Sequence, residues 1–500
     1  MKGRGAENRR VRALRRKPGV VYARSMDIEY TSTERTRRER APRLAGLLAA
    51  LCLTGFVLVL TGACASTDPF AEAAEELGES GEDVAEPGSA APRYQEGWSA
   101  LDAAEPPAAL AALMDGAGAD GVLPPGSLPL REGNRIWFAV RTPGAASVTI
   151  VASFNAPGGP DPLIPYADSG WFWKGYAAPD GAKASYIFLA RDASGLAAQL
   201  RDPGNPAVEA KGHYMSVLRE AGASRIEMAE FPFLLHGREL PDRYSVATRR
   251  VLVYLPAGYD ADPDRRYPVL YFQDGQNVWD SSAANHGGWK AETVMDRLVA
   301  AGTVRPAIIV SISNTGYRSQ EYAGAGFHRA SDGTDSRALA IAEYYRDWTV
   351  EVLKPEIDRR YRTLGDRANT GVVGSSYGGT LASYWALSRP GVFGLAAAVS
   401  YAPGDEKELS GGLTALARET YLPAIAAAGL ILPRFWLDCG TAGLDGTLVP
   451  FARAFDEVLR SGGFRPGPDY RFELFPGADH NEAAWYRRLP EILAFLLPVE

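Results

Sequence analysis

Two serines stand side by side in the segment "TGVVGSSYGGTLASYW", residues 370–385. The stretch 374–378 fits the pattern G-x-S-x-G with Ser376 at its centre. In this pattern the serine occupies a tight turn between a strand and a helix, and the glycines are required because larger residues would collide with those elements. Ser375 has no such pair of glycines, since valine and tyrosine stand at 373 and 377. The spacing therefore predicts that Ser376 is a nucleophile.

A serine hydroxyl is a weak nucleophile at neutral pH and needs a base in contact with it. In hydrolases with this turn, an acid and then a histidine follow the serine along the chain. The sequence has five histidines, and only His480 follows Ser376. This order predicts that His480 is the base.

The acid should lie just after the strand-like segment "RFWLDCG", residues 434–440. Asp445 follows a glycine-rich turn and precedes a helical pattern, so its carboxylate could reach the imidazole and hold its tautomer. Asp438, at the end of the strand, and Asp479, beside the histidine, remain alternatives. The sequence favours Asp445.

An oxyanion hole needs two backbone N–H groups, one from the residue after the nucleophile and one from a loop after an earlier strand. Tyr377 supplies the first, and Gly275 and Gln276 in "VLYFQDGQNVWD" supply the second. No histidine pair has metal-ligand spacing and no glycine loop fits a phosphate, so we expect neither a metal nor an organic cofactor.

The elements that must position these residues run from 230 to 500. Apolar segments of strand length, such as "RRVLVYLP", "PAIIVSISN" and "LAAAVSYAP", alternate there with helical patterns such as "LVPFARAFDEVLRSGG". This alternation predicts an α/β domain with a mostly parallel sheet covered on both faces. The site should then lie at the carboxyl ends of the strands.

Residues 126–229 have a different texture, with short alternating runs such as "RIWFAVRTP" and "ASYIFLARD" closed by turn residues. They predict a small all-β sandwich of about seven strands. Trp171 and Trp173 either stack on a sugar ring or pack inside the sandwich.

Residues 1–64 combine a basic leader with the uncharged stretch 44–63 and a closing group of small residues. This layout is typical of an export signal, although the stretch is also long enough to span a bilayer. The ending "LTGAC" resembles a lipoprotein signal in which Cys64 carries the lipid. We therefore expect an exported protein held at the membrane by a lipid on Cys64 or by an uncleaved apolar helix, and plain secretion is the remaining alternative.

Residues 65–125 are acidic and rich in Ala, Gly and Pro, which predicts a flexible tether with a weak helix near Trp98 to Met114. The basic residues concentrate in the leader, where residues 1–43 carry 14 Lys and Arg against five Asp and Glu. The remainder is strongly acidic, which argues against nucleic acid as a partner.

The segment 245–497 resembles the esterase D family of α/β-hydrolases, which includes enterochelin, feruloyl and acetylxylan esterases. The blocks "YFQDGQNVWD", "ISNTGYRSQEY", "VLKPEIDRRYRT", "GVVGSSYGG" and "PGADHNEAAWYRRLP" carry the likeness. The preceding "VTIVASFN" and "GWFWKGYAAPDGAKASYIFLA" resemble early-set immunoglobulin-like domains related to glycogen-binding modules. This order of domains occurs in carbohydrate-active enzymes and in enterochelin esterases.

The resemblance implies a serine esterase with Ser376 as nucleophile, His480 as base and an acid after the sixth long strand. The expected substrates are small-molecule or oligosaccharide esters, first of all acyl esters on carbohydrate. A siderophore ester is the alternative, and a non-catalytic binding protein is a more remote one.

Further substrate-binding candidates are Trp279, in the "QNVWD" block, and Arg318 and Glu321 in "YRSQEY". The "YRSQEY" block borders the active site in the family. Arg318 and Glu321 are equally consistent with a structural ion pair.

Overall fold

The computed structural model describes residues 98–117, 123–124, 126–155, 160–210, 214–220, 222–241, 244–280, 287–323, 334–403 and 412–499, with 334–339 described by their backbone alone. The basic leader, the apolar stretch 44–63, Cys64 and the tether up to 97 lie outside the described residues. In the part of the chain that is described, no helix has the length and apolar character needed to cross a membrane.

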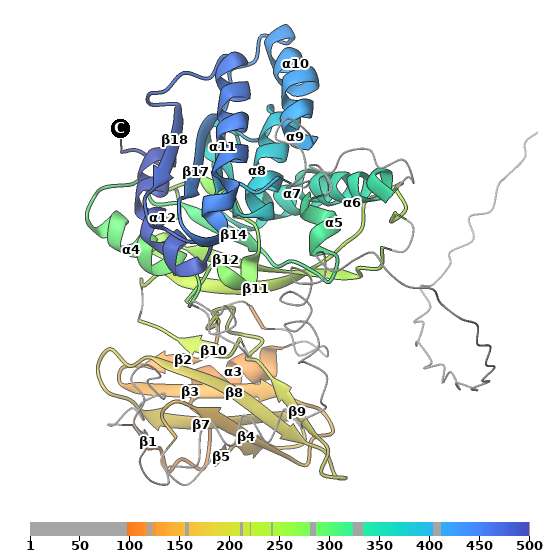
Figure 1. The fold of residues 1–500 in the computed structure, drawn as a ribbon. Coiled ribbons are helices and arrows are strands. Elements are labelled where there is room, and N and C mark those ends of the chain that lie inside the picture. The colour runs from red at the N-terminus through yellow and green to blue at the C-terminus, as the bar shows by residue number, and fades with distance from the viewer. Residues whose placement is uncertain are drawn as a thin grey trace, which may run out of the picture. The chain divides into compact units, whose positions relative to one another are not determined.

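The first described domain is a sandwich of two antiparallel sheets (Figure 1). One sheet has the order β1-β7-β3-β2, and β6 also pairs with β7. The other sheet has the order β10-β8-β4-β5, and β9 also pairs with β8. The described residues form ten strands here, rather than about seven. Their bounds are β1 Ser99–Ala100, β2 Leu130–Glu132, β3 Arg135–Arg141, β4 Ser147–Ala152, β5 Asp161–Pro162, β6 Ile164–Tyr166, β7 Trp171–Ala177, β8 Ala184–Arg191, β9 Ala197–Leu200 and β10 Ser216–Leu218.

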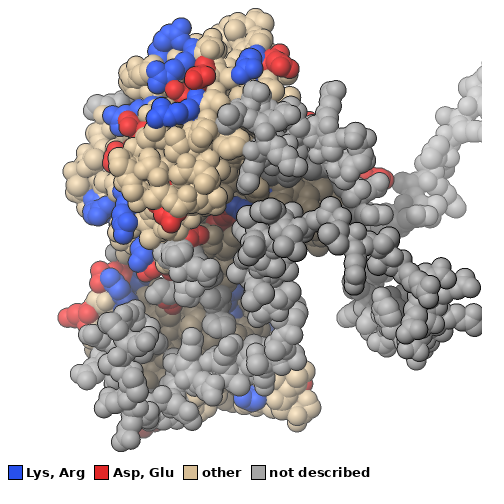
Figure 2. All heavy atoms as spheres, in the orientation of Figure 1, with Lys and Arg blue, Asp and Glu red and all other residues tan. Residues whose placement is uncertain are grey.

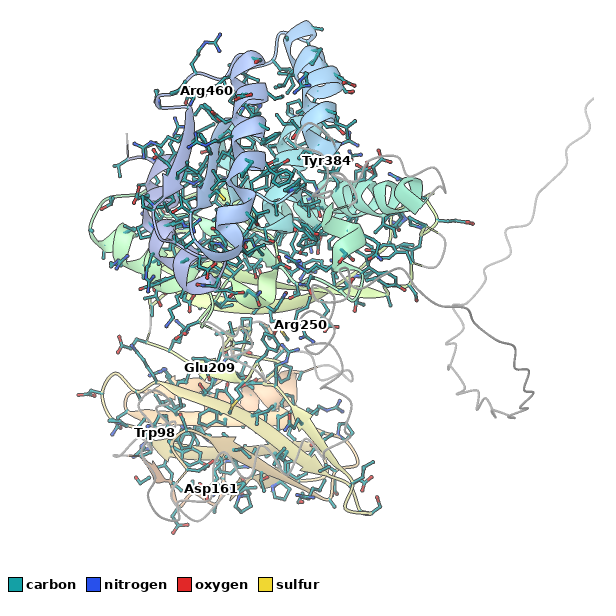
Figure 3. The ribbon with its side chains drawn as sticks, viewed as in Figure 1. Trp98, Asp161, Glu209, Arg250, Tyr384 and Arg460 are labelled. Carbon is teal, nitrogen blue, oxygen red and sulfur yellow. The ribbon has the colours of Figure 1, made fainter. Side chains whose placement is uncertain are left out.

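The predicted tether is too long, because the sandwich already begins at Trp98. Trp98, labelled in Figure 3, stacks on Phe154 with ring centroids 4.1 Å apart. Helix α3 (Ala108–Gly116) buries Leu110 and Met114 in an apolar cluster of the sandwich. These two residues are four apart and share one helical face. The helix expected near Trp98 to Met114 is thus present over Ala108–Gly116, and it packs on the sandwich.

The tryptophans on β7 pack inside the sandwich. Trp171 is 2% exposed and Trp173 is 1% exposed, and both join Trp137 in the cluster beneath α3. Because their faces are covered by protein, neither can stack on a sugar ring. The packing interpretation of this pair is therefore the one that the structure supports.

The second domain contains an eight-stranded sheet with the order β11-β12-β14-β13-β15-β16-β17-β18. The first three strands pair antiparallel, and every pair from β14 onward is parallel. The bounds are β11 Arg225–Pro232, β12 Thr248–Leu255, β13 Val269–Phe272, β14 Ile308–Ile312, β15 Thr370–Ser375, β16 Leu395–Val399, β17 Arg434–Gly440 and β18 Tyr470–Phe475. The predicted α/β fold with a mostly parallel sheet is confirmed.

The boundary between the two domains lies earlier than the predicted step from 229 to 230. β11 starts at Arg225 and pairs with β12 along its whole length. It is an edge strand with only two buried residues in eight, so its sequence lacks the continuous apolar run that marks the inner strands.

Alternate side chains along the strands fill two separate cores. Val253 and Tyr271 face the core covered by α6, α8 and α11, whereas Leu252 and Leu270 face the core covered by α4 and α12. This two-sided burial is what a sheet sandwiched between helices requires. The helices are α4 Ala291–Ala300, α5 Arg318–Ala323, α6 Thr334–Trp348, α7 Lys354–Arg360, α8 Tyr377–Ser388, α9 Gly412–Leu416, α10 Leu422–Ala427, α11 Gly443–Ser461 and α12 Glu482–Leu496, and a π-helical turn at Thr349–Leu353 joins α6 to α7.

Charged residues of both signs are interspersed on the described part of the face drawn in Figure 2. No field of a single sign covers the described surface in that view. The excess of acidic residues in the chain therefore does not form a single acidic patch on the described part of this face.

Asp202 is a buried carboxyl in the sandwich, where it accepts hydrogen bonds from the Tyr186 hydroxyl (2.8 Å) and the Gly204 amide (2.9 Å). Burial raises its pKa to about 7 against the opposing effect of these hydrogen bonds. Because the folded state then binds a proton that the unfolded chain has released, stability is lost as the pH rises from about 4 to about 7. We expect Asp202→Asn to remove this loss, which amounts to at most about 1.4 kcal/mol per pH unit.

Urea unfolding of the parent and of Asp202→Asn between pH 4.5 and 8 measures this difference. Asp161→Asn is the matched control, because Asp161 also accepts from a tyrosine of the sandwich, Tyr176 (3.0 Å), but is partly exposed. A constant difference between parent and Asp202→Asn across this range would contradict the expectation.

Candidate active site

Ser376 lies on the turn between the end of β15 and the start of α8. Its φ is 56° and its ψ is −131°, a backbone conformation that L-residues rarely adopt. A Cβ on Gly374 would lie 2.2 Å from the Gly378 carbonyl oxygen, and a Cβ on Gly378 would lie 3.3 Å from the Gln273 Cβ. The glycine spacing therefore meets a steric requirement. Ser376 is partly exposed at the top of this turn, whereas Ser375 is buried.

His480 and Asp445 meet beyond the ends of the last two strands. His480 follows β18, Asp445 lies in the first turn of α11, and Nδ1 of the histidine is 2.6 Å from Oδ1 of the carboxylate. The sequence predicted that Asp445 precedes this helix. In the structure the helix begins at Gly443, two residues before the aspartate. Ser376, Asp445 and His480 thus follow the carboxyl ends of three parallel strands, β15, β17 and β18, at one edge of the sheet.

The loops that carry the acid and the histidine are fastened to each other. The Ala442 amide donates to the Ala478 carbonyl (3.0 Å), and the Gly477 amide donates to Oγ1 of Thr441 (2.9 Å). Gly443 has a φ of 52°, and a Cβ there would lie 2.0 Å from Oδ1 of Asp479. The segment "GTAGLD" is therefore a tight turn shaped by the histidine loop.

The other two carboxylates that the sequence left open have different partners. Asp438 lies on β17 and accepts hydrogen bonds from Trp436, from the Ser400 amide and from Arg488. Asp479 accepts the backbone N–H of His480 (2.7 Å). Among the described residues, the carboxylate bound to the imidazole is that of Asp445.

Asp445 is fully buried, yet it is held in its charged form. Burial opposes the charge, but hydrogen bonds from His480, Ser400 and Arg488 outweigh it and hold the pKa of Asp445 below its ordinary value. Burial instead raises the pKa of Asp438, with Arg488 opposing the rise. A charged carboxylate on Nδ1 can fix the tautomer of His480 and stabilise its imidazolium.

Ser376 and His480 share no hydrogen bond in the described part of the chain. In triads of this type the bond between nucleophile and base is commonly long and tightens only in the complex with substrate. The arrangement of the three residues at one sheet edge is therefore compatible with nucleophilic catalysis.

The predicted oxyanion loop lies directly beside the serine turn. Asp274 has a φ of 54° and opens a 3₁₀ turn, Gly275–Asn277. A Cβ on Gly275 would lie 2.7 Å from the backbone of Ile312 and Ser313, so only glycine fits there. Gly275 and Gln276, with Tyr377 as the first residue of α8, remain the predicted donors, since the first amides of a helical turn are not used within it.

Arg318 braces this loop from α5. Its guanidinium donates to both carboxylate oxygens of Asp274 (2.6 and 2.7 Å), and Asn314 donates to the same carboxylate (2.6 Å). Arg318 is 34% exposed and its guanidinium lies 6.0 Å from the Tyr377 ring centroid. Arg318 is therefore within reach of the site, and its ion pair is with Asp274.

Glu321 and Trp279 were predicted to contact substrate, and the structure contradicts both expectations. Glu321 is fully buried and pairs with the buried Arg249, while Tyr244 (2.7 Å) also donates to its carboxylate. Trp279 is fully buried and donates to the Ser311 hydroxyl (2.9 Å). Glu321 fixes α5 against β12, and Trp279 belongs to the core. The predictions failed because each motif indicates that its residue lies near the site but does not determine the direction of the side chain.

Sequence reasoning missed three residues of the site, namely Asp274, Ser400 and Arg488. Ser400 follows β16, and its position directly after an apolar strand was the available signal. Arg488 lies within the apolar face of α12, where a buried arginine implies a buried acidic partner.

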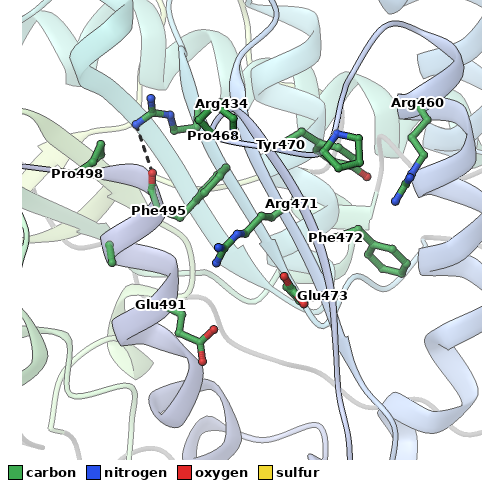
Figure 4. A pocket seen from close by; sticks show the side chains of 13 residues that line it. Arg434, Arg460, Pro468, Tyr470, Arg471, Phe472, Glu473, Glu491, Phe495 and Pro498 are labelled. Atoms are coloured by element: carbon green, nitrogen blue, oxygen red, sulfur yellow. Dashed lines mark hydrogen bonds between the residues drawn. The ribbon is translucent and has the colours of Figure 1, made fainter.

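A cavity of about 650 Å³ runs along the outer strand β18 (Figure 4). Its lining includes Arg434 and Tyr470, the first residues of β17 and β18, and Phe495 near the end of α12. The cavity therefore opens at the amino ends of these strands. The candidate catalytic residues follow the carboxyl ends.

Comparison with protein families gives a match to the Esterase model, described as "Putative esterase", over residues 246–436. A curated relative, an endo-1,4-beta-xylanase/feruloyl esterase of Xylanibacter ruminicola, is 32% identical over 165 residues. The aligned part covers 31% of this chain and 20% of the relative. The chain thus spans about a fifth of the length of that relative.

Two solved structures illustrate the further matches. A ferulic acid esterase of Anaeromyces mucronatus is 20% identical, with 55% of this chain and 93% of that chain covered and a TM-score of 0.39. The enterobactin esterase of Shigella flexneri is 16% identical, with 72% and 93% covered and a TM-score of 0.39. The esterase family model thus matches residues 246–436, which lie within the α/β domain of this chain.

Proposed function

We propose that this protein is a carboxylic ester hydrolase that works through an acyl-enzyme on Ser376. The observation that carries the proposal is the alignment of three groups at one sheet edge. Ser376 stands on a turn with a positive φ, and Nδ1 of His480 is hydrogen-bonded to the carboxylate of Asp445, which is buried and charged. The match of residues 246–436 to the esterase family supports the same reaction class.

In the proposed reaction, His480 takes the proton of Ser376 as Oγ attacks the ester carbonyl carbon. The amides of Tyr377 and of the Gly275–Gln276 loop stabilise the resulting oxyanion. His480 then returns the proton to the leaving alcohol, and an acyl-enzyme remains. Water, deprotonated by His480, then attacks the acyl carbon. As the bond from this carbon to Oγ of Ser376 breaks, His480 returns the proton to Oγ and the carboxylic acid is released, while Asp445 stays ionised throughout.

For the substrate, we propose acyl esters carried by carbohydrate. The support is the curated relative, whose name combines a xylanase with a feruloyl esterase. Comparing kcat/KM on acetylated xylan, methyl ferulate and a cyclic catecholate trilactone tests this proposal. A preference for the trilactone would favour a siderophore ester instead.

Replacement of Ser376 tests the nucleophile. Ser376→Ala should lower kcat by about 10⁴-fold or more, whereas Ser375→Ala, at the buried neighbour, should cost far less. Hydrolysis of p-nitrophenyl acetate and covalent labelling by a fluorophosphonate measure both variants. Equal losses would refute the choice of serine, and a parent protein that neither hydrolyses nor labels would favour a non-catalytic binding protein.

Replacement of Asp445 tests the acid. Asp445→Asn should reduce kcat by at least about 100-fold with a small change in KM, because the amide no longer stabilises the imidazolium. Asp456→Asn is the matched control, since Asp456 is a buried carboxylate of the same helix that binds Arg460 and Tyr470 instead. Steady-state kinetics would contradict the assignment if the two variants lost activity equally.

For the location, we propose export with a lipid anchor on Cys64, supported by the sequence of the leader alone. In this case Cys64→Ser should move the protein from the membrane fraction to the soluble fraction of cells that express it. Retention of the variant in the membrane would favour the uncleaved apolar helix. An immunoblot of both fractions distinguishes the two outcomes.

A further inference from the structure

Ser400 is a fixed hydrogen-bond donor to the candidate acid. It follows β16, and its Oγ accepts hydrogen bonds from Nε1 of Trp485 (2.8 Å) and from Nη1 of Arg488 (3.0 Å). An indole and a guanidinium can only donate. The hydroxyl proton of Ser400 is therefore directed to its third neighbour, Oδ2 of Asp445, at 2.6 Å.

Arg488 links two buried carboxylates. From α12 it donates Nη1 to Oδ1 of Asp438 (2.8 Å) and Nη2 to Oδ2 of Asp445 (3.0 Å). Asp438 is otherwise surrounded by donors, because the Ser400 amide (2.9 Å) and the Trp436 indole (2.7 Å) both point to it. Burial raises the pKa of Asp438, but a carboxyl proton would find no acceptor among these donors. The hydrogen-bond geometry therefore fits the charged form of Asp438.

The three buried groups together determine the net charge next to the imidazole of His480. Arg488 alone would cancel the charge of Asp445 and weaken its attraction for an imidazolium. With Asp438 present, the buried group of two carboxylates and one guanidinium keeps a net charge of −1. An imidazolium formed on His480 then makes the whole cluster neutral.

We propose that Asp438 and Ser400 are positioning residues for the hydrolysis proposed above. Asp438 neutralises Arg488, so that the guanidinium can orient Asp445 without cancelling its charge. Ser400 turns Oδ2 of Asp445 inward and leaves Oδ1 for His480. Neither residue touches the ester, and the inference rests on the proposed function.

The charged and titratable groups around His480 come from several elements. They are Asp445 from α11, Asp438 from β17, Arg488 and Glu482 from α12, and Asp479 from the loop of the histidine itself. Cys439 adds a buried thiol that contacts the Asp445 carbonyl. Asp438 binds Arg488 and not His480, so its removal leaves the direct partners of His480 in place.

The first test is Asp438→Asn in the full chain, assayed with p-nitrophenyl acetate from pH 5 to 9. Loss of one buried negative charge makes the imidazolium less stable. We expect kcat to fall about tenfold with KM within twofold of the parent, and the acid limb of the kcat/KM profile to move down by roughly one pH unit. An unmoved acid limb in the folded variant would overturn the role of Asp438.

Ser400→Ala is the second test, and it removes a hydroxyl without changing any charge. We expect kcat to fall about tenfold with KM unchanged and no downward movement of the acid limb. This contrast separates a loss of orientation from a loss of charge. Parental kcat in Ser400→Ala would overturn the role of Ser400, even if Asp438→Asn does not fold.

Asp456→Asn again serves as the control, since it also replaces a buried carboxylate and should lower the melting temperature without moving the pH profile. The parent protein separates the two levels of the proposal. A parent without Ser376-dependent hydrolysis overturns the function and this inference together. Hydrolysis by the parent, with both variants matching it in rate and pH profile, overturns this inference alone.

Discussion

A carboxylate that has lost all contact with water must be kept charged by the protein alone, and the site depends on this condition at Asp445. Its partners come from four places: His480 after β18, Ser400 after β16, the backbone of Gly440 at the end of β17, and Arg488 on α12. The parallel order of the strands brings these groups together, because parallel strands deliver the residues that follow them to the same edge.

A second constraint is the close approach of backbones at the two turns that carry chemistry. A side chain on Gly374 would meet the carbonyl of Gly378, and one on Gly440 would meet the carbonyl of Ala478, each at 2.2 Å. Clashes with backbone cannot be relieved by a change of rotamer. The serine turn and the acid–histidine loops are thus both fixed in position by residues that have no side chain.

The sequence predicted those features of the site that depend on local sterics or chain order. The glycine spacing identified the turn at Ser376, and the single histidine after it identified His480, which the structure places beside Asp445. Side-chain partners were harder to predict. Arg318 and Glu321 are neighbours on one helix, yet each pairs with a residue from elsewhere, Asp274 and Arg249 respectively.

The contacts of Ser400 and Arg488 were beyond the reach of sequence patterns, because the two residues are 88 positions apart and meet only through the tertiary fold. The edge strand β11 was missed for a related reason. It buries few residues, so its apolar signal is weak although its pairing with β12 is complete.

The participation of α12 ties the site to the last helix of the described chain. Trp485 and Arg488 complete the surroundings of Asp445, and α12 otherwise holds to the sheet through an apolar face shared with α4. During synthesis from the ribosome, the acid therefore lacks its guanidinium until nearly the whole domain has emerged. In the mature protein, local detachment of α12 would remove Arg488 and Trp485 from the surroundings of Asp445 while the strands of the sheet stay paired. Activity would then be lost before the fold unfolds.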